Sequence, residues 1–341
     1  MMAEPLYIYT ETAFHHEGNY DFMISLIDES KKAGVNGVKF QVLMDLDNLT
    51  SSKHTAYPTL KQYVFTAAQW LKIIEYAQGI GLDVIMMPLD IESLVLLNTI
   101  KKPKYLEIHP VCFYDQNLIS EMKKTNVPII VGVGGRTEDE IQEITKRLGS
   151  QLEVLMVGFQ SFPSKLEDVK LKKIQSLKAK YPALSIGYAD HSSYSDDFSI
   201  TSNEYALLFG AKIFEKHITI NEGVERVDYV SALNGDRLKH LVSKLHFLND
   251  NILTVSEEQL NLMDEPELIY RNRQKVFVAK TDLKKNHTIT KEDVVMKMIN
   301  KEGGFSQVNE LIGAQLSENV EKDDVITKNH LHQSAGIKHH E

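Results

Sequence analysis

The sequence predicts an α/β protein: a closed (β/α)8 TIM barrel followed by a small β-rich domain. Between residues 7 and 253, a short apolar run, a turn and an amphipathic helix recur eight times, which is typical of this barrel. The apolar runs are nearly continuous, as in parallel strands that are buried on both faces. Beyond residue 253 the runs are short and separated by polar turns, which indicates a second fold.

The predicted strands of the barrel cover residues 7–10, 37–42, 83–87, 105–109, 128–132, 154–158, 184–188 and 212–217. Glycine directly after a helix permits the left-handed backbone conformation that ends it. Glycines stand in such places after the predicted helices, at Gly34, Gly79, Gly81, Gly149 and Gly210.

Polar and titratable side chains gather at the carboxyl ends of the predicted strands, where a barrel of this kind carries its reactive groups. Two runs, 38–41 and 214–217, also have polar residues at alternate positions inside otherwise apolar strands. A polar side chain inside a barrel needs a partner or a ligand. The strand-end residues are Glu11, His15, His16, Glu17, Lys39, Gln41, His109, Gln160, Asp190, His191, Glu215 and His217.

Four parts are expected along the chain: a barrel over residues 1–255, a linker over 256–272, a small β domain over 273–333 and a disordered tail over 334–341. The small domain contains two similar phrases, 281–289 and 318–326, in which a polar turn precedes an apolar pair. At about 60 residues it is marginal as an independent fold, so docking onto a barrel would stabilise it.

Composition excludes several classes of protein. A net charge of -9 without a basic stripe argues against nucleic-acid binding. Cys112 is the single cysteine, which excludes an intrachain disulfide and suits a reducing compartment. We see no signal peptide and no run near the roughly 18 apolar residues of a membrane span. A cytoplasmic protein without membrane partners is expected.

Four stretches and the C-terminal segment together resemble the sialic acid synthase family. Residues 11–19 (ETAFHHEGN) resemble its E-I-G-x-N-H-x-G opening, and residues 38–41 (VKFQ) resemble its V-K-x-Q. Residues 186–191 (IGYADH) are similar to G-x-S-D-H, and residues 214–219 (FEKHIT) are similar to E-K/R-H-F-T. Residues 273–330 resemble the antifreeze-like (SAF) domain that follows the family's barrel.

The resemblance implies a reaction in which the enolate carbon of phosphoenolpyruvate adds to the aldehyde of an open-chain N-acetylated amino sugar. Water attacks the second carbon, phosphate leaves, and a nonulosonic acid results. It also implies a divalent metal, Mn²⁺ or Mg²⁺, and a homodimer in which each SAF domain covers the barrel of its partner.

His191 and His217 match the two metal ligands of the family. They end neighbouring predicted strands, so their rings can converge on one ion, which would polarise the sugar aldehyde. The alternative is that each is a hydrogen-bonded strand-end histidine.

Glu11, Lys39 and Asp190 are the expected catalytic residues. Glu11 matches a glutamate placed to activate water, although a structural ion pair with Lys39 is the alternative. Lys39 and Gln41 match a phosphoenolpyruvate-side pair, and Asp190 is expected to orient a neighbouring histidine.

The remaining expected contacts are with the substrates. His16 and Glu17 lie in the first loop, where the family binds sugar hydroxyls. Gln160 stands in place of an asparagine, and Lys297 stands close to an arginine that the family extends into the partner's sugar site. Asp228 matches an aspartate that contacts the sugar, although an ordinary solvated loop acid is equally compatible with the sequence.

The sequence departs from the family on the phosphoenolpyruvate side. A fourth-strand lysine is replaced by Glu107, and nearby hydroxyl positions carry other residues: Met87, Pro110, Gly132 and Ala189. Exchanging a cation for an anion about 4 Å from a ligand charge changes the interaction by roughly twice 4 kcal/mol at an effective dielectric near 20. Either Arg136, His109 or the metal compensates, or a one-residue shift of register turns Glu107 outward.

Residues 132–135 leave another choice open. This glycine-rich turn precedes a predicted helix at Thr137, so its backbone amides could bind phosphate, or it is a plain tight turn.

Three functions therefore stay open. The first is a divergent synthase, and the second is a barrel lyase, aldolase or isomerase that has lost the phosphoenolpyruvate pocket. The third is a non-catalytic sugar-binding relative.

Overall fold

The computed structural model describes residues 5–158, 161–271, 273–299 and 303–332. It divides into two compact units, Met1–Val255 and Ser256–Glu341. The division falls at the boundary expected between the barrel and the linker. The two units are described separately below.

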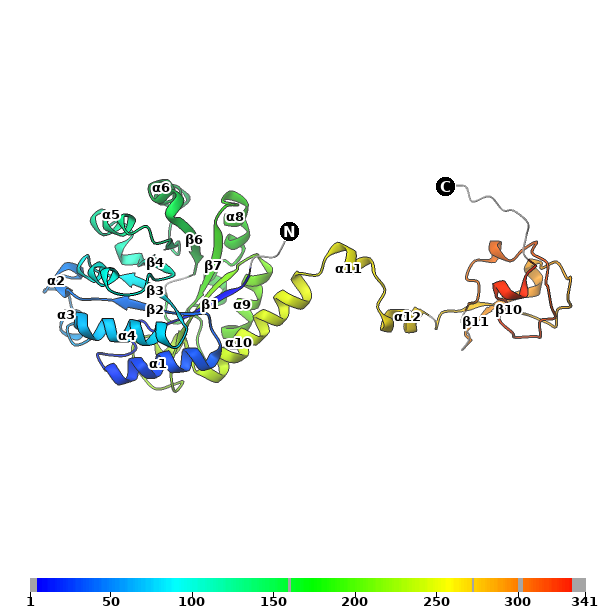
Figure 1. Cartoon of the computed structure of the whole chain (residues 1–341), viewed down its shortest axis with the longest axis horizontal. Helices are drawn as coiled ribbons and strands as arrows, with labels where there is room; N and C mark the ends of the chain where they lie inside the picture. The colour runs from blue at the N-terminus through cyan, green and yellow to red at the C-terminus, as the bar shows by residue number, and fades with distance from the viewer. Residues whose placement is uncertain (1–4, 159–160, 272, 300–302, 333–341) are drawn as a thin grey trace. The chain divides into compact units, whose positions relative to one another are not determined.

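The first unit is a closed parallel barrel with its helices on the outside (Figure 1). Each strand pairs in parallel with the next, and pairing of β1 with β8 closes the ring. All eight predicted strands are present, and none of their ends differs from prediction by more than two residues. The strands are β1 (Tyr7–Glu11), β2 (Gly37–Val42), β3 (Asp83–Pro88), β4 (Tyr105–Ile108), β5 (Ile129–Gly132), β6 (Leu152–Val157), β7 (Ser185–Asp190) and β8 (Ile213–Ile218), with a short β9 (Ala232–Leu233) added beside β8.

The helices of the first unit have chemically defined ends. Thr66 and Thr137 form capping boxes with Gln69 and Glu140, and Gly34 takes the left-handed conformation expected after α1. The helices are α1 (Tyr20–Ala33), α2 (Leu46–Leu49), α3 (Tyr57–Leu60), α4 (Ala67–Gly79), α5 (Gln116–Lys124), α6 (Glu138–Leu148), α7 (Leu166–Val169), α8 (Lys172–Lys180), α9 (Phe198–Leu208) and α10 (Gly235–Leu248), and a 3-10 helix, η1 (Glu92–Asn98), follows β3.

Side chains along each strand alternate between two separate cores. One set fills the centre of the barrel and includes Tyr9, Ile130 and Ile213. The other set lies between the strands and the helices and includes Ile8 and Phe214. Successive residues of a strand point to opposite faces, so the face on which a strand-end residue lies follows from its position in this alternation.

The second unit contains the helices α11 (Glu257–Asn261) and α12 (Glu265–Arg271) and an antiparallel pair, β10 (Val276–Ala279) and β11 (Val294–Lys297). The two similar phrases of the sequence bind each other reciprocally. The backbone N–H of Lys285 donates to Asn319 Oδ1 (2.8 Å), and that of Lys322 donates to Asp282 Oδ1 (2.8 Å). These four residues occupy matching positions in the phrases, so the repeat in sequence forms an approximate two-fold arrangement.

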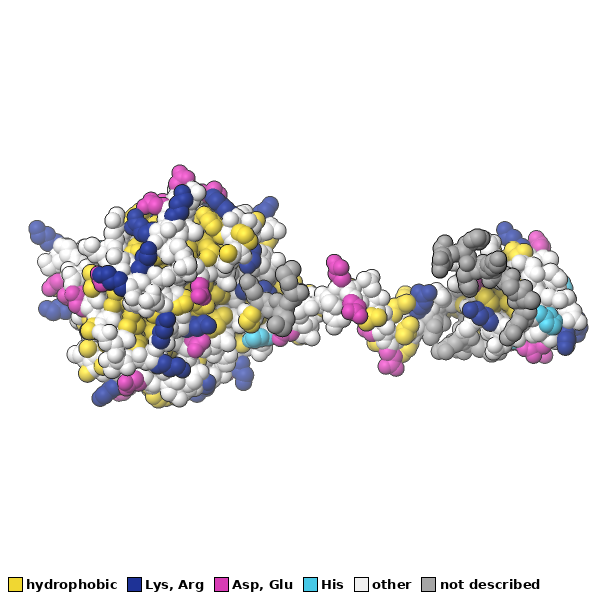
Figure 2. Space-filling view, turned by 45° about the horizontal axis from the view of Figure 1, so that its top comes forward, with side chains coloured by type: hydrophobic (Ala, Val, Ile, Leu, Met, Phe, Trp, Pro, Cys, Tyr) yellow, Lys and Arg dark blue, Asp and Glu magenta, His cyan; other side chains and the backbone are white. Residues whose placement is uncertain are grey.

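Apolar side chains are exposed along α11 and α12 (Figure 2). Tyr270 is 77% exposed and Leu260 is 71% exposed. None of the described helices has the length and apolar character needed to cross a membrane.

Gly18 gives a test of the loop that follows β1. Its φ is +78°, and a Cβ there would lie 2.1 Å from the backbone oxygen of Gln62. Gly34 is a matched control, because its φ is +80° and no atom would lie within 4 Å of its Cβ. We expect Gly34→Ala to destabilise the protein by about 1–2 kcal/mol through backbone strain alone. Gly18→Ala should cost about 1–3 kcal/mol more because of the clash. Urea unfolding of the two variants measures the difference, and equal losses would show that the loop adapts freely.

Candidate active site

A cavity of about 230 Å³ opens at the carboxyl ends of the barrel strands. The groups that line it come from all eight strands or from the turns that follow them. They are Glu11, Phe14, Lys39, Gln41, Met87, Glu107, His109, Pro110, Gly132, Gly134, Met156, Gly158, Phe162, Ala189, His191, Glu215, His217 and Asp228.

One buried ammonium group, that of Lys39, lies at the base of this cavity. Its Nζ is 3.1 Å from Glu11 Oε2, 2.9 Å from Glu107 Oε1 and 2.6 Å from Glu215 Oε2. The hydroxyl of Tyr9 donates to Glu215 (2.7 Å) and to Glu107 (3.2 Å). The ion pair between Glu11 and Lys39 is therefore present, but as one part of a four-residue ionic cluster, which we call the Lys39 cluster (Lys39, Glu11, Glu107 and Glu215).

Three carboxylates around one ammonium cannot all ionise easily in a buried site. Burial, with repulsion from the neighbouring carboxylates, raises the pKa of Glu107 to about 8 and that of Glu215 to about 7. Burial also opposes ionisation of Glu11, but Lys39 and hydrogen bonds from Glu215 and Gln41 outweigh it and lower its pKa. Glu11 is thus the carboxylate that stays charged, and Gln41 Nε2 holds its Oε1 at 2.7 Å.

Four groups of the cavity are arranged so that they could hold one metal ion. One ligand atom from each of Glu11, His191, Glu215 and His217 lies within 4.8 Å of the others. Among the described residues, His191 Nδ1 and His217 Nε2 are buried and have no hydrogen-bond partner. A buried nitrogen without a partner is costly unless a ligand completes it.

The protonation of the two histidines also suits metal binding. Burial lowers the pKa of His191 to about 4 and that of His217 well below its usual value. Both rings are therefore neutral near pH 7, which is the form that binds metals. Mixed carboxylate and imidazole ligands are compatible with Mn²⁺ or a similar divalent ion.

The loop after β1 positions the loop that carries Asp228. Glu17 binds Arg226 Nη1 (3.0 Å) and the backbone N–H of Val227 (3.1 Å), and His15 Nδ1 lies 2.6 Å from Val227 O. Asp228 lines the cavity, and burial raises its pKa to about 6. Glu17 therefore supports the cavity wall from behind instead of lining it.

His16 does not line the cavity. It stacks on Phe65 with 4.6 Å between ring centroids and lies edge-on to Trp70. Burial lowers its pKa to about 3. His16, which was predicted to contact the sugar, instead packs against aromatic side chains beneath the loop that follows β1.

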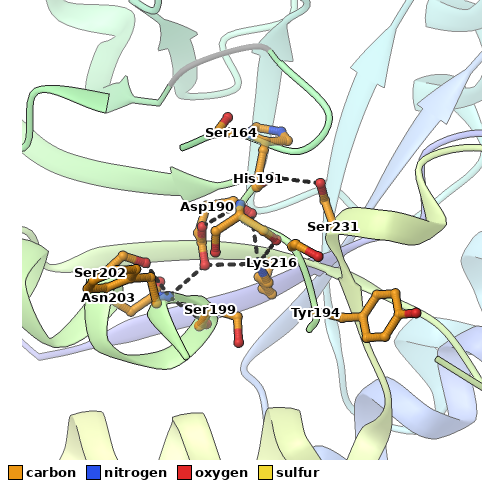
Figure 3. A network of polar contacts seen from close by, with 12 residues as sticks. Ser164, Asp190, His191, Tyr194, Ser199, Ser202, Asn203, Lys216 and Ser231 are labelled. Carbon is orange, nitrogen blue, oxygen red and sulfur yellow. Dashed lines mark hydrogen bonds and ion pairs between the residues drawn. The ribbon is translucent and has the colours of Figure 1, made fainter. Parts of the chain in front are cut away.

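Asp190 lies on the outer face of β7, away from the cavity (Figure 3). Its Oδ2 is 2.9 Å from Lys216 Nζ and accepts a hydrogen bond from Asn203 Nδ2 (2.9 Å), and its Oδ1 accepts one from the backbone N–H of Ser192 (2.8 Å). No hydrogen bond joins it to an imidazole among the described residues. The structure therefore does not bring Asp190 to the reacting groups, and the pair with Lys216 instead ties together the ends of β7 and β8, which carry His191 and His217.

The side of the cavity near Pro110 is poor in free cations. Glu107 faces inward, which resolves the register left open by the sequence, because its carboxylate contacts Lys39. Arg136 donates to Pro110 O (2.9 Å) and stacks over the Phe113 ring at 4.1 Å. The helix that follows the glycine-rich turn has its N-terminus capped by Thr137 and Glu140.

Two predicted site residues lie elsewhere. Gln160 falls outside the described residues. Lys297 lies in the second unit, where it forms an ion pair with Asp323.

Glu215 was predicted only as a strand-end residue without a role, and Tyr9 was not predicted as a site residue. A sequence signal for Glu215 existed, since it stands two positions before His217 in a strand and so lies on the same face. Tyr9 stands two positions before Glu11 in the same way. The sequence did not reveal that these residues would meet at Lys39.

Comparison with known proteins agrees with this architecture. A family model described as the NeuB family matches residues 26–252. A second model, described as a chaperone for flagella basal body P-ring formation, matches residues 274–341 and is consistent with a SAF-like domain there.

Relatives align with this chain over nearly its whole length, and the alignments cover nearly all of their own length. The chain is 26% identical over 340 residues to a pseudaminic acid synthase of Campylobacter jejuni, covering 94% of this chain and 95% of that protein. It is 24% identical over 366 residues to an N-acetylneuraminate-9-phosphate synthase of Drosophila melanogaster, covering 97% of each. A crystal structure of N-acetylneuraminic acid synthetase from Leptospira borgpetersenii, in complex with citrate, matches with a TM-score of 0.69 at 26% identity and covers 79% of this chain and 92% of that chain.

His217→Ala tests the metal centre. We expect Mn²⁺ binding, measured by calorimetric titration, to weaken by at least about tenfold, because one of four converging ligands is lost. His109→Ala is the matched control: it removes a histidine from the same cavity but outside the group of four, and Mn²⁺ affinity should change little. Equal binding by the wild type and His217→Ala would contradict this assignment.

Lys216→Met tests the ion pair between Asp190 and Lys216, which lies outside the cavity. It leaves the Asp190 carboxylate buried without its cation, so the protein should lose about 3–5 kcal/mol of unfolding free energy. The double variant Asp190→Asn, Lys216→Met should recover most of that loss, as measured by urea unfolding. A double variant that is no more stable than Lys216→Met would argue against a paired role.

Proposed function

Because the chain belongs to the NeuB family, we propose that it joins a three-carbon enolate to the aldehyde carbon of an N-acetylated amino sugar and so forms a nonulosonic acid. The observation that carries the proposal is the convergence of His191, His217, Glu11 and Glu215 at the mouth of the barrel. The printed names of the relatives, which include a pseudaminic acid synthase, support the product class.

A divalent metal held by His191 and His217 with the two carboxylates would act as a Lewis acid on an oxygen of the substrates. Gln41 orients Glu11 by its hydrogen bond, and Lys39 keeps Glu11 charged, so Glu11 is suited to accept a proton from a water or a substrate. We expect Asp228, which also lines the cavity, to contact sugar hydroxyls.

Two substrates can supply the three-carbon unit, and they define two candidate functions. With phosphoenolpyruvate, as the resemblance of the sequence implies, C3 attacks the aldehyde, water adds at C2 and phosphate leaves; this is the synthase reaction. With pyruvate, the enzyme is a metal-dependent aldolase, and the same product can also be cleaved in reverse. The second candidate is favoured by Glu107, whose carboxylate lies inside the cavity and pairs with Lys39, so that this ammonium is not free to bind a phosphate.

We further propose that the protein is a homodimer in which the second unit, including Lys297, contacts the barrel of the partner chain. The exposed apolar side chains of α11 and α12 support such a contact, because apolar area of this kind is commonly covered by a partner. Light scattering of the purified protein would measure its mass.

The reaction is tested by incubating the protein with Mn²⁺, N-acetylmannosamine or diacetamido-hexoses, and either phosphoenolpyruvate or pyruvate. We expect a nonulosonic acid by mass spectrometry from at least one pair of substrates. Removal of the metal with a chelator, or the change His217→Ala, should lower the rate by at least about a hundredfold. Absence of product from every pair would refute the proposed function.

A further inference from the structure

The hydrogen-bonding capacity of Lys39 is already used within the protein. A lysine ammonium has three N–H donors, and three carboxylate oxygens, from Glu11, Glu107 and Glu215, lie 2.6–3.1 Å from Nζ. The side chain of Lys39 is only 2% exposed. An anionic substrate must therefore displace a carboxylate before it can bind this ammonium.

No other cationic side chain takes its place in the described part of the cavity. Lys39 is the one Lys or Arg among the described residues that line it. Arg136, near the glycine-rich turn, does not line the cavity; its Nη2 donates to Pro110 O and its guanidinium lies over the Phe113 ring, whereas its buried Nε has no hydrogen-bond partner among the described residues. His109 accepts a hydrogen bond from the backbone N–H of Val111 at Nδ1 (3.1 Å), so its neutral ring carries its proton on Nε2.

The backbone offers little compensation. A phosphate group carries roughly -1.5 to -2 charges at neutral pH, and proteins usually bind it with Arg, Lys or the free amides of a helix N-terminus. The nearest such helix, α6, has Glu138, Asp139 and Glu140 in its first turn, and Glu140 accepts a hydrogen bond from the backbone N–H of Thr137. These carboxylates oppose a phosphate at that helix end.

We propose that Glu107 determines the three-carbon substrate by occupying the Lys39 ammonium, and that the site accepts pyruvate, a 2-keto acid with a single negative charge and no phosphate group, in preference to phosphoenolpyruvate. The inference rests on the proposed function, namely carbon–carbon bond formation in this cavity, and selects between its two candidate substrates. Glu107 acts here as a specificity-determining residue, because it occupies the one ammonium that a phosphate would need.

The reaction with pyruvate balances without another reactant. A C–H bond at C3 of pyruvate breaks, and its proton goes to a carboxylate of the cavity. The electron pair left on C3 forms the bond to the aldehyde carbon, and the π pair of the aldehyde moves to its oxygen, which takes up a proton. The product is a 4-hydroxy-2-keto acid, and neither water nor phosphate is consumed or released.

Calorimetric titration of the full-length protein with pyruvate and with phosphoenolpyruvate, in the presence of Mn²⁺, tests the proposal. For the wild type we expect pyruvate to bind at least about tenfold more tightly than phosphoenolpyruvate. Glu107→Ala removes one of the three acceptors around the Lys39 ammonium, so affinity for phosphoenolpyruvate should rise by about tenfold or more relative to pyruvate. The matched control is Glu143→Ala, which removes a carboxylate from a side chain that is 66% exposed on α6, and should leave the ratio unchanged.

Each outcome decides a different point. If the wild type binds phosphoenolpyruvate as tightly as pyruvate, the inference is overturned, and the proposed function stands if phosphoenolpyruvate and sugar yield product. If a folded Glu107→Ala protein leaves the ratio unchanged, Glu107 is not the determinant. If neither compound binds, the inference fails, and product analysis with the sugar panel then judges the proposed function separately. The wild-type comparison needs no variant, and circular dichroism establishes whether Glu107→Ala is folded.

Discussion

A single ammonium group shared among three carboxylates is the constraint on which the site depends. Lys39 on β2 cannot be buried without partners, and its partners come from β1, β4 and β8. The Lys39 cluster therefore fixes side chains from four strands at the base of one cavity. The cluster also limits the positive charge that is available to bind a ligand, because all three N–H donors of the ammonium already have acceptors. Two of the three carboxylates, those of Glu107 and Glu215, ionise with difficulty.

The alternation of side chains along the strands separates two ionic networks that are adjacent in sequence. Glu215 and His217 face the cavity, whereas Lys216 between them faces outward and pairs with Asp190. The inner network contains the groups to which we assign the proposed chemistry. The outer network, in which Asp190 binds Lys216, joins the ends of β7 and β8 (Figure 3). Ligand atoms of His191 and His217, at these strand ends, lie within 4.8 Å of one another.

The cavity combines a group of possible metal ligands with a lysine that is already paired. The groups able to hold a metal ion are together in this chain, which aligns over 95% of the length of a pseudaminic acid synthase. In the same cavity the inward carboxylate of Glu107 forms an ion pair with Lys39. Function in a barrel resides in the groups grafted onto it, so membership of a family defines the class of reaction more firmly than the identity of each substrate.

The sequence by itself determined the order of the eight strands, the helix ends and the presence of Glu11, Lys39, His191 and His217 at one end of the barrel. These features depend on local periodicity and on the rule that parallel strands bring their carboxyl ends to one rim. Only the tertiary structure decided that Glu107 points inward, that Asp190 points outward, and that Glu215 and Tyr9 join Lys39. Those outcomes depend on the register between strands that are distant in sequence, and a shift of one residue would reverse each of them. Sequence patterns do not specify that register, because it is set when the barrel closes and its interior side chains must find partners.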